Sequence, residues 1–454
     1  MKGLALGAVS ALVLLLSSTA SAQDITFGGE LSLATRIFVQ DGLYDGQDDA
    51  GVSPILSGRV ELFAPVAGGQ AVLEAFGQWD PRTDATRADL PRAFYQRSFD
   101  GFDVLVGSNI EFWGVSEGNR PVDVINQEDV LDAPNRRDRL GQPMVNVNID
   151  IGSRGSLGLW GLGGFRERDF GDDNARFRAP FLTDDDDAQF EEGKGRHFDF
   201  AARYTSSLRL GNSAVDFAVS YFNGTDRNPS QVLTCRRPGG LVTEDICNAV
   251  NAASNDPFDT SSPQIDTDDV LETLDGLVTE DLATLASEQS NIVFVPNYQH
   301  IQQLGGEFAL TNGDFQFTLE GAVRFATGET SFAGTIGGQY TLNDLFNTDA
   351  QMLLISEYLY DNRSALQPLN FFENDVFLGF NYNQNDVAGT QLTGGFYVDT
   401  ESVAQIYSLT FGRRLTDSLK LNVSALFINT DGFNDPLSFV EKDGYVEMSL
   451  AWFF

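Results

Sequence analysis

Residues 447–454, EMSLAWFF, form an apolar run in a chain whose formal net charge is −36. Around this run, apolar side chains occupy every second position, and the positions between them are small or polar. The apolar set is Val446, Met448, Leu450, Trp452 and Phe454, and the intervening set is Glu447, Ser449 and Ala451. A period of two is that of a β-strand with one apolar face. The rest of the chain must explain what this face contacts.

The same alternation recurs from end to end. In residues 315–325, FQFTLEGAVRF, Phe317 and Leu319 fall on one face, while Thr318 and Glu320 fall on the other. The abundance of glycine, 45 residues, and phenylalanine, 36 residues, is also typical of all-β chains. The pattern predicts strands near residues 24–38, 55–64, 70–79, 90–99, 102–113, 144–151, 156–164, 197–208, 214–222, 298–310, 314–325, 331–341, 350–361, 375–383, 389–398, 402–412, 418–429 and 444–454.

The connections between these strands separate a barrel from a β-sandwich, which would also alternate. Connections after even-numbered strands are mostly short, such as PVAGG and TNG, whereas those after odd-numbered strands are often long, such as 114–142, 166–196 and 223–297. Short turns at one end and long loops at the other are typical of outer-membrane barrels. Residues 23–454 are therefore predicted to form one all-β, transmembrane antiparallel β-barrel of about eighteen strands, with sixteen as the alternative and with long extracellular loops.

The first 22 residues predict export. Lys2 precedes an apolar run that ends in small residues at Ala20 and Ala22, the pattern of a cleavable signal peptide. The alternative, a membrane anchor, needs a longer apolar run. The segment at 447–454 also resembles the ending of outer-membrane β-barrel proteins, which finish on a strand with a terminal phenylalanine. The resemblance implies recognition of Phe454 by the barrel-assembly machinery and location in the outer membrane of a Gram-negative bacterium, with its lipid and lipopolysaccharide. A soluble edge strand with an aromatic end is the other interpretation.

A barrel of this size leaves a lumen wide enough for water. Alternation predicts that charged residues of both signs face this lumen, so neither a pure anion pore nor a pure cation pore follows. The predicted wall set is Arg59, Glu61, Arg203, Glu320, Arg324 and Lys420.

The connection at residues 114–142 is the candidate constriction. It carries aromatic, acidic and basic residues close together, and opposite charges across a narrow lumen create a transverse field that selects charged or dipolar solutes. The candidate solute-contacting residues are Trp113, Arg120, Asp123, Glu128, Asp129, Arg136, Arg137 and Arg139. The alternative is an external loop held together by its own salt bridges.

The same region resembles porin-like families of the alginate-export kind. Residues 91–114, PRAFYQRSFDGFDVLVGSNIEFWG, and 121–129, PVDVINQED, are similar to their pattern of an Arg-x-Ala-aromatic strand, a glycine-containing strand that leads to Trp-Gly, and Asp, Asn and Asp in the loop. The matching positions are Arg92, Ala93, Phe94, Gly107, Trp113, Gly114, Asp123, Asn126 and Asp129. The resemblance implies a solute channel and leaves the solute open.

The 223–297 connection is too long for a plain loop. Cys235 and Cys247 lie in it, and in an exported chain they are expected to form a local disulfide, because no histidine nearby favours a metal site. Residues 268–288 have apolar residues at helical spacing, which predicts a helix over the barrel mouth or its rim. A lipid-binding or partner-docking helix is the alternative.

The four consecutive acids Asp184, Asp185, Asp186 and Asp187 could hold a loosely bound calcium ion, although a solvated acidic loop explains them as well. No other cofactor or metal is expected. The acidic excess argues against a nucleic-acid partner, since phosphate binding needs basic surface.

Enzyme activity is not expected, because no nucleotide loop or nucleophile elbow occurs and the only histidines are His197 and His300. The sequence therefore predicts a porin-like channel for passive diffusion of small hydrophilic or charged solutes. A non-transport surface barrel for adhesion or structure and a transporter of hydrophobic compounds are the alternatives. The oligomeric state stays open.

Overall fold

The computed structural model describes residues 25–131, 138–193, 198–238, 244–253, 291–364, 368, 370–430 and 436–454. Three predictions lie outside this part of the chain: the signal peptide at residues 1–22, the helix at 268–288, and the constriction residues Arg136 and Arg137.

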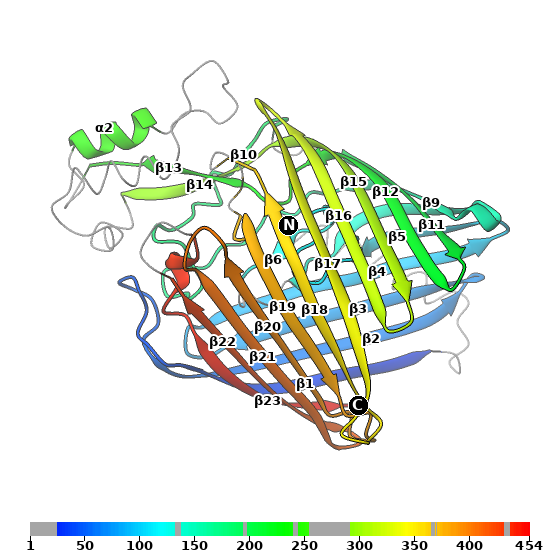
Figure 1. Cartoon of the computed structure of the whole chain (residues 1–454). Coiled ribbons are helices and arrows are strands. Elements are labelled where there is room, and N and C mark those ends of the chain that lie inside the picture. The colour runs from blue at the N-terminus through cyan, green and yellow to red at the C-terminus, as the bar shows by residue number, and fades with distance from the viewer. Residues whose placement is uncertain are drawn as a thin grey trace.

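Eighteen strands form one closed antiparallel sheet (Figure 1). Each barrel strand pairs with its neighbours in the chain, and β1 pairs with β23 to close the ring. The barrel strands are β1 (Thr26–Phe38), β2 (Gly51–Val66), β3 (Gly69–Asp80), β4 (Ala85–Phe99), β5 (Phe102–Asn109), β8 (Gln142–Asp150), β9 (Ser156–Gly163), β11 (Phe198–Leu210), β12 (Ser213–Thr225), β15 (His300–Asn312), β16 (Phe315–Ala326), β17 (Glu329–Leu345), β18 (Ala350–Asp361), β19 (Asn374–Asn383), β20 (Gln391–Asp399), β21 (Gln405–Thr416), β22 (Leu419–Asn429) and β23 (Tyr445–Phe453). The prediction of an eighteen-stranded antiparallel barrel is confirmed, and the sixteen-stranded alternative is wrong.

The seam between β1 and β23 is paired along its length. Leu33 lies opposite Leu450, and Glu30 lies opposite Phe453. Just past the end of β23, Phe454 exchanges two backbone hydrogen bonds of 3.1 Å with Gly29 of β1. A Cβ atom on Gly29 would come within 2.7 Å of the Arg59 carbonyl oxygen and 2.5 Å of the Phe454 ring, so this position needs glycine. Closure leaves no barrel strand with an unpaired edge.

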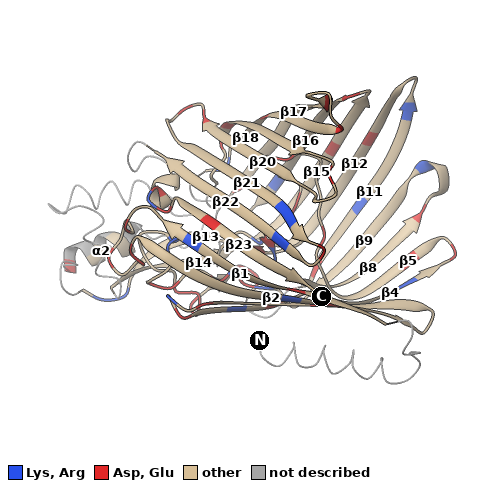
Figure 2. Cartoon of the chain, turned by 90° about the horizontal axis from the view of Figure 1, so that it is seen from below, with Lys and Arg blue, Asp and Glu red and all other residues tan. Residues whose placement is uncertain are grey.

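The alternation of each strand separates an apolar outer face from a polar inner face. On β16, Leu319 is 46% exposed on the outer face, whereas Glu320 is 1% exposed on the inner face. On β23, Met448 and Trp452 are about half exposed, at 51% and 48%. The apolar face of residues 447–454 therefore points out of the barrel. Charged residues are scattered along the strands in the view from below (Figure 2).

The two ends of the barrel differ in their connections. At one end, here called the turn end, the connections are 67–68, 100–101, 151–155, 211–212, 313–314, 346–349, 384–390 and 417–418. At the other, the loop end, they are 39–50, 81–84, 110–141, 164–197, 226–299, 327–328, 362–373, 400–404 and 430–444. Only 81–84, 327–328 and 400–404 among the latter are as short as the turns.

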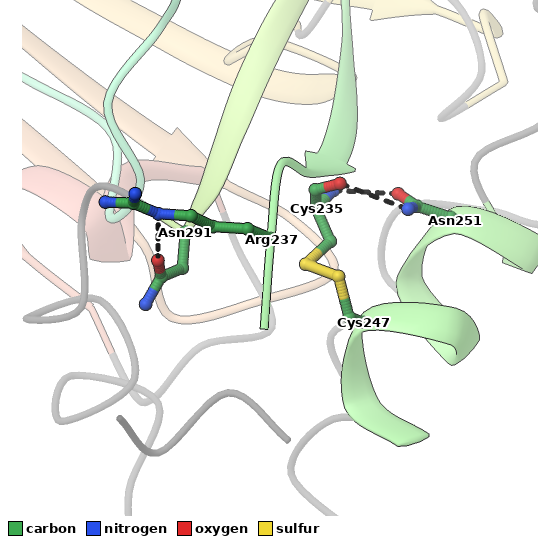
Figure 3. Close-up of a disulfide and its surroundings, with 5 residues drawn as sticks. All are labelled: Cys235, Arg237, Cys247, Asn251 and Asn291. Carbon is green, nitrogen blue, oxygen red and sulfur yellow. Dashed lines mark hydrogen bonds between the residues drawn. A yellow bond between two sulfur atoms is a disulfide. The ribbon is translucent and has the colours of Figure 1, made fainter. Parts of the chain in front are cut away.

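The loop end also carries a second, smaller sheet, which lies beyond the barrel in Figure 1. Its strands are β10 (Gln189–Phe190), β14 (Ile292–Tyr298) and β13 (Ser230–Cys235), in that order, with helix α2 (Glu244–Ala253) beside them. A disulfide joins Cys235, at the end of β13, to Cys247 on α2, and the Asn251 side chain hydrogen-bonds the Cys235 backbone (Figure 3). None of the helices in the described residues is long and apolar enough to span a membrane.

This sheet has its own core. Leu233, Phe181 and Phe294 are buried there, and Tyr44 from the first loop-end connection packs against them. Three separate connections thus form one small folded unit. Three short elements complete the structure: the pair β6 (Glu128–Asp129) and β7 (Asp138–Arg139), and the 3-10 helices η1 (Gly152–Arg154) and η2 (Pro436–Val440).

Candidate functional site

The connection between β5 and β8 lies inside the barrel, and its described residues, 110–131 and 138–141, are here called the inward loop. Five successive backbone N–H groups, from Gly114 to Gly118, donate to the carboxylates of Glu307, Glu320 and Glu357 at 2.7–3.2 Å. These glutamates lie on the inner faces of β15, β16 and β18 and are at most 5% exposed. Hydrogen bonds to carboxylates are stronger than those between neutral groups. The loop backbone is therefore fixed to the barrel wall.

Further contacts extend this attachment toward β20. The Tyr397 hydroxyl donates to the Gly118 carbonyl at 3.0 Å, and the Thr335 hydroxyl donates to the Asn119 carbonyl at 3.2 Å. The Gln303 amide donates to the Val122 carbonyl at 3.3 Å. The inward loop thus lies along the wall formed by β15–β18 and β20.

Trp113 anchors the start of this segment. It is 1% exposed and meets Trp160 edge-on, with ring centroids 5.2 Å apart. The Arg203 guanidinium lies 5.8 Å from the Trp113 ring. The sequence predicts that Trp113 contacts solute, but burial under the loop gives it a structural role instead. Gly114, next in the chain, has a φ of 110°, a conformation that favours glycine.

The side of the lumen away from these contacts holds an open cavity of about 370 Å³. All the residues that line it come from β1, β2, β3, β21, β22 and β23, and most are small or polar. The lining is Glu30, Ser32, Ala34, Arg36, Ile55, Ser57, Gln78, Thr410, Asn422, Ser424, Glu447 and Ser449. We call this region, together with the adjoining inner face of β4, the open half of the lumen, and the wall of β15–β18 and β20 the covered half.

Charges in the open half are paired with each other. Arg36 and Glu447 form a buried ion pair of 2.7 Å. Arg59 and Arg92 both bind Glu74, and their side chains remain 40% and 44% exposed. The buried carboxylate Glu74 thus presents two arginines toward the interior.

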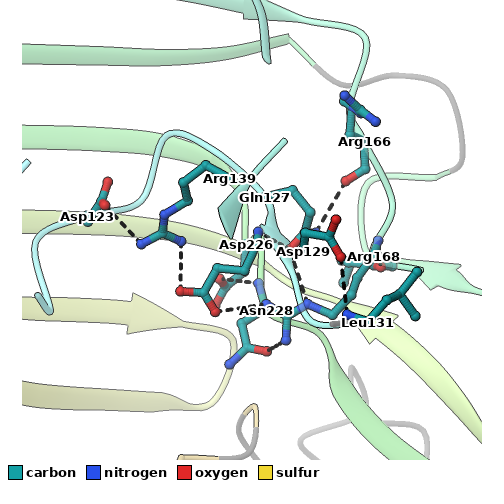
Figure 4. Close-up of polar contacts among 11 residues, drawn as sticks. Asp123, Gln127, Asp129, Leu131, Arg139, Arg166, Arg168, Asp226 and Asn228 are labelled. Atoms are coloured by element: carbon teal, nitrogen blue, oxygen red, sulfur yellow. Dashed lines mark hydrogen bonds and ion pairs between the residues drawn. The ribbon is translucent and has the colours of Figure 1, made fainter. Parts of the chain in front are cut away.

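The charged residues predicted to face each other across the lumen instead pair locally. Arg139 binds Asp123 at 2.9 Å (Figure 4) and Glu128 at 2.7 Å, and all three residues belong to the inward loop. Asp129 binds Arg87 on β4. Burial raises the pKa of the Asp123 carboxyl, although Arg139 favours its charged form. The sequence predicts that these residues face opposite charges across the lumen. In the structure their partners lie in the same loop or on the adjacent strand β4, so this prediction is wrong for them.

Arg120 is the most accessible arginine of the inward loop. Its side chain is 35% exposed, its Nε donates to the Ser116 carbonyl at 2.7 Å, and its nearest carboxylate in the structure, Glu117, is 3.4 Å away. Glu117 is itself 46% exposed. This pair remains accessible to solute in the described part of the loop.

A second cavity, of about 330 Å³, lies at the loop end and is here called the mouth pocket. Its walls combine the inward loop, the connections 164–197, 226–299, 362–373 and 430–444, and the inner faces of β15–β17. Seven arginines line it: Arg120, Arg139, Arg168, Arg178, Arg227, Arg324 and Arg363. Five carboxylates do so: Asp123, Glu128, Asp129, Asp226 and Asp361. Seven phenylalanines complete it: Phe170, Phe177, Phe181, Phe294, Phe371, Phe372 and Phe439.

Arg168 illustrates how the pocket holds buried positive charge. Its Nη1 donates to Asn228 at 2.6 Å and its Nε to Gln127 at 3.2 Å (Figure 4). Its ion pair with Glu128 is long, at 3.6 Å, and Glu128 is shared with Arg139. Burial lowers the pKa of the Arg168 guanidinium, because the carboxylates of Glu128 and Asp226 compensate only part of the lost hydration.

The predicted wall residues all lie on inner faces. Glu320 accepts from the inward loop, Arg203 pairs with Glu307 at 2.6 Å, and Arg324 lines the mouth pocket. In the strand register, Glu61 lies opposite the buried Glu74, and Lys420 lies opposite the buried Ala451. Sequence reasoning missed Glu307 and Glu357. Alternation around Glu307 could have identified it, whereas the pattern around Glu357 is too irregular.

The acidic run at 184–187 is partly neutralised by an arginine. Arg236 binds Asp184 at 2.6 Å and Asp187 at 2.5 Å. The described residues contain no group of three His, Cys, Asp or Glu side chains placed to hold one metal ion. The calcium site stays a prediction from the sequence alone.

Comparison with known proteins gives structural likenesses only, since neither a family model nor a curated protein matches the chain. A mutant of the porin of Rh. blastica is 13% identical, with a TM-score of 0.39, and the match covers 95% of this chain and 100% of that one. OprB of Pseudomonas putida is 10% identical (TM-score 0.42; 95% and 94% covered), and OccK11 of Pseudomonas aeruginosa is 10% identical (TM-score 0.45; 95% and 95% covered). At TM-scores below 0.5 these likenesses carry no functional argument, and the barrel is established by the closed sheet itself.

Proposed function

We propose that this protein is a porin-like channel of the outer membrane through which small hydrophilic or charged solutes diffuse passively. The observation that carries the proposal is the combination of a closed barrel with an apolar outer face and a polar cavity beside an inward loop. An apolar outer band suits lipid, and a polar interior suits water and dissolved solutes. No catalytic role is part of the proposal.

The orientation of the barrel in the membrane follows from the difference between its turn end and its loop end. In outer-membrane barrels the short turns face the periplasm and the long loops face outward. The turn end of this chain would then be periplasmic, and the small disulfide-linked sheet would face the exterior. Phe454, at the β1–β23 seam, is the residue we propose for recognition by the barrel-assembly machinery.

The path would run through the open half of the lumen. There a solute passes Arg59 and Arg92 on one side and the accessible pair Glu117 and Arg120 on the inward loop. Charged groups in a narrow, partly dehydrated space interact more strongly than groups at an open surface. The constriction is thus proposed to lie between the inward loop and the wall of β1–β4.

Single-channel conductance in planar bilayers, followed by liposome swelling with a panel of sugars and amino acids, tests the proposal. Stepwise currents and swelling that declines with solute size are expected. A folded barrel that gives neither current nor swelling would refute a channel.

The small sheet favours one alternative, a surface barrel for adhesion or structure, because it has its own core and a disulfide at the loop end. That alternative expects no conductance above lipid background. Deleting residues 230–298, which begin with β13 and end with β14, should then abolish surface attachment. The channel proposal expects the conductance of the same variant to persist.

A further inference from the structure

Asn126 lies where the two stems of the inward loop separate. Strands β5 and β8 are paired up to Asn109 and Gln142, and the chain enters and leaves the inward loop beyond this pair. The Nδ2 group of Asn126 donates to the Asn109 carbonyl and to the Leu140 carbonyl, each at 2.9 Å. Its Oδ1 atom accepts the Glu111 N–H, also at 2.9 Å. One side-chain amide therefore joins both stems.

The chemistry of this position requires an asparagine side chain. Asn126 is 2% exposed, so water does not readily replace a partner that is lost. Its amide uses both N–H groups as donors and its oxygen as an acceptor. An aspartate would turn an oxygen toward two carbonyl oxygens, and an alanine would leave three main-chain polar groups without this partner. Two donors and one acceptor on a short side chain are therefore needed here.

The hydrogen bonds of Asn126 divide the long connection between β5 and β8. Asn126 comes 17 residues after one of the two carbonyls that it binds and 14 residues before the other. Its bond to Glu111 closes a segment, residues 111–126, whose ends are 15 positions apart in the chain. A short closed segment has fewer conformations than a long open one. This segment contains the accessible pair Glu117 and Arg120, so its closure restricts where that pair lies.

Apolar packing holds the same segment against the barrel wall. Val122, Val124 and Ile125 are buried and belong to one apolar cluster with Trp113 and with side chains of the inner wall. The hydrophobic effect is not directional, so this packing does not fix how the two stems lie relative to each other. Hydrogen bonds depend on distance and angle and do fix it. The amide of residue 126 supplies three such bonds at the end of the apolar run.

We propose that Asn126 is the positioning residue of the constriction. Its amide fixes the segment 111–126 at the stems, and thereby sets where Glu117 and Arg120 lie relative to the wall of β1–β4. The carboxylates of the covered half hold the other side of the same segment. This inference rests on the proposed channel function, since the position of the accessible pair matters only where solutes pass.

Asn126→Asp tests the role, because it keeps the size of the side chain and removes both donors. Single channels are recorded in KCl, and the fraction of time that the channel spends at each current level is measured. One level should dominate in the unchanged protein. In the variant, the fraction of time at a second level should rise at least about tenfold, because buried carbonyls that lose their donors destabilise the attached state of the loop.

Asn146→Asp is the matched control. Asn146 is a buried asparagine on the inner face of β8, 4% exposed, and its Nδ2 group donates to the Leu159 carbonyl of β9 at 3.2 Å. Its Oδ1 atom accepts from Asn148 of the same strand. The same substitution at this wall position should leave the current levels unchanged. The change of gel mobility on heating shows whether each variant assembles, which separates a folding defect from a displaced loop.

The outcomes separate the two proposals. A second level that is equally frequent in Asn126→Asp and Asn146→Asp, or rare in both, overturns the positioning role and leaves the channel standing. Absence of current in the unchanged protein overturns the channel and this inference with it. If Asn126→Asp does not assemble, Asn126→Ser, which adds no charge, is measured in the same way. Failure of both to assemble, while Asn146→Asp assembles, overturns the role, because Asn126 then serves folding rather than position.

Discussion

The covered and open halves of the lumen use the same residue type in different ways. In the covered half, the buried glutamates Glu320 and Glu357 accept backbone N–H groups of the inward loop. In the open half, the buried Glu74 binds the side chains of Arg59 and Arg92. All three carboxylates are at most 4% exposed.

The difference lies in what each carboxylate holds in place. A carboxylate that binds backbone N–H groups positions a chain segment, so its loss should change the width of the lumen. A carboxylate that binds partly exposed arginines balances charge, so its loss should change which ions pass. Buried glutamates on one barrel wall can therefore set two separate properties of a channel.

The largest expected effect is release of the inward loop. In the double variant Glu320→Gln, Glu357→Gln, four charge-assisted hydrogen bonds become neutral ones, each weaker by about 1 kcal/mol. The loop should detach from the covered wall, and single-channel conductance should rise at least about twofold if attachment limits the path. Unchanged conductance in correctly assembled protein would show that the loop does not narrow the channel.

Placing a charged side chain on the lipid-facing side of a barrel strand should have the next largest effect. Leu319→Arg places a charge on the lipid side of β16 and should hinder assembly by about 2–4 kcal/mol, measured by refolding yield in lipid vesicles. Gln316→Arg, on the inner face, is the matched control and should assemble. Thr318→Arg, which the alternation alone predicts to be tolerated, should fail, because Thr318 is 0% exposed.

Asp443 extends the comparison to a buried carboxylate at the loop end. Its Oδ1 accepts from Arg176 at 2.8 Å, its Oδ2 has no partner among the described residues, and burial raises the pKa of its carboxyl to about 7. The folded state then binds more protons than the unfolded state between about pH 4 and pH 7. The free energy of unfolding should therefore fall as pH rises through this window, by up to about 1.4 kcal/mol per unit.

Urea titrations in vesicles at pH 5 and pH 7.5, followed by tryptophan fluorescence, measure this dependence. Asp443→Asn removes the titrating group and should flatten the profile over the same window. An equally steep profile in the variant would assign the pH dependence to other groups.

The smallest expected effect belongs to the open half. Glu74→Gln leaves Arg59 and Arg92 without their carboxylate, and both are exposed enough that stability should change by only about 1 kcal/mol or less. Reversal potentials in a KCl gradient should shift toward chloride, while conductance stays near that of the unchanged protein. A shift toward potassium would contradict the placement of these arginines on the path.

Strand positions could be predicted because they depend on a local rule. Side chains alternate with a period of two, so the set around Leu319 and the set around Met448 each reveal an outward face without any knowledge of their neighbours. The same rule fails around Glu357, where the alternation is poor. It also gives no warning of the small sheet of β10, β14 and β13, because those strands pair across distant loops.

The amino-acid sequence by itself determined an antiparallel barrel of about eighteen strands and the outward face of those strands that alternate clearly, since both follow from periodicity within each strand and from the order of short and long connections. Only the tertiary structure decided that Trp113 is buried, that Arg139 binds Asp123 and Glu128 beside it, and that five backbone N–H groups meet carboxylates from three distant strands. Those contacts join residues far apart in the chain, and a backbone N–H group occurs at nearly every position. No local pattern can therefore mark the ones that a wall carboxylate will bind.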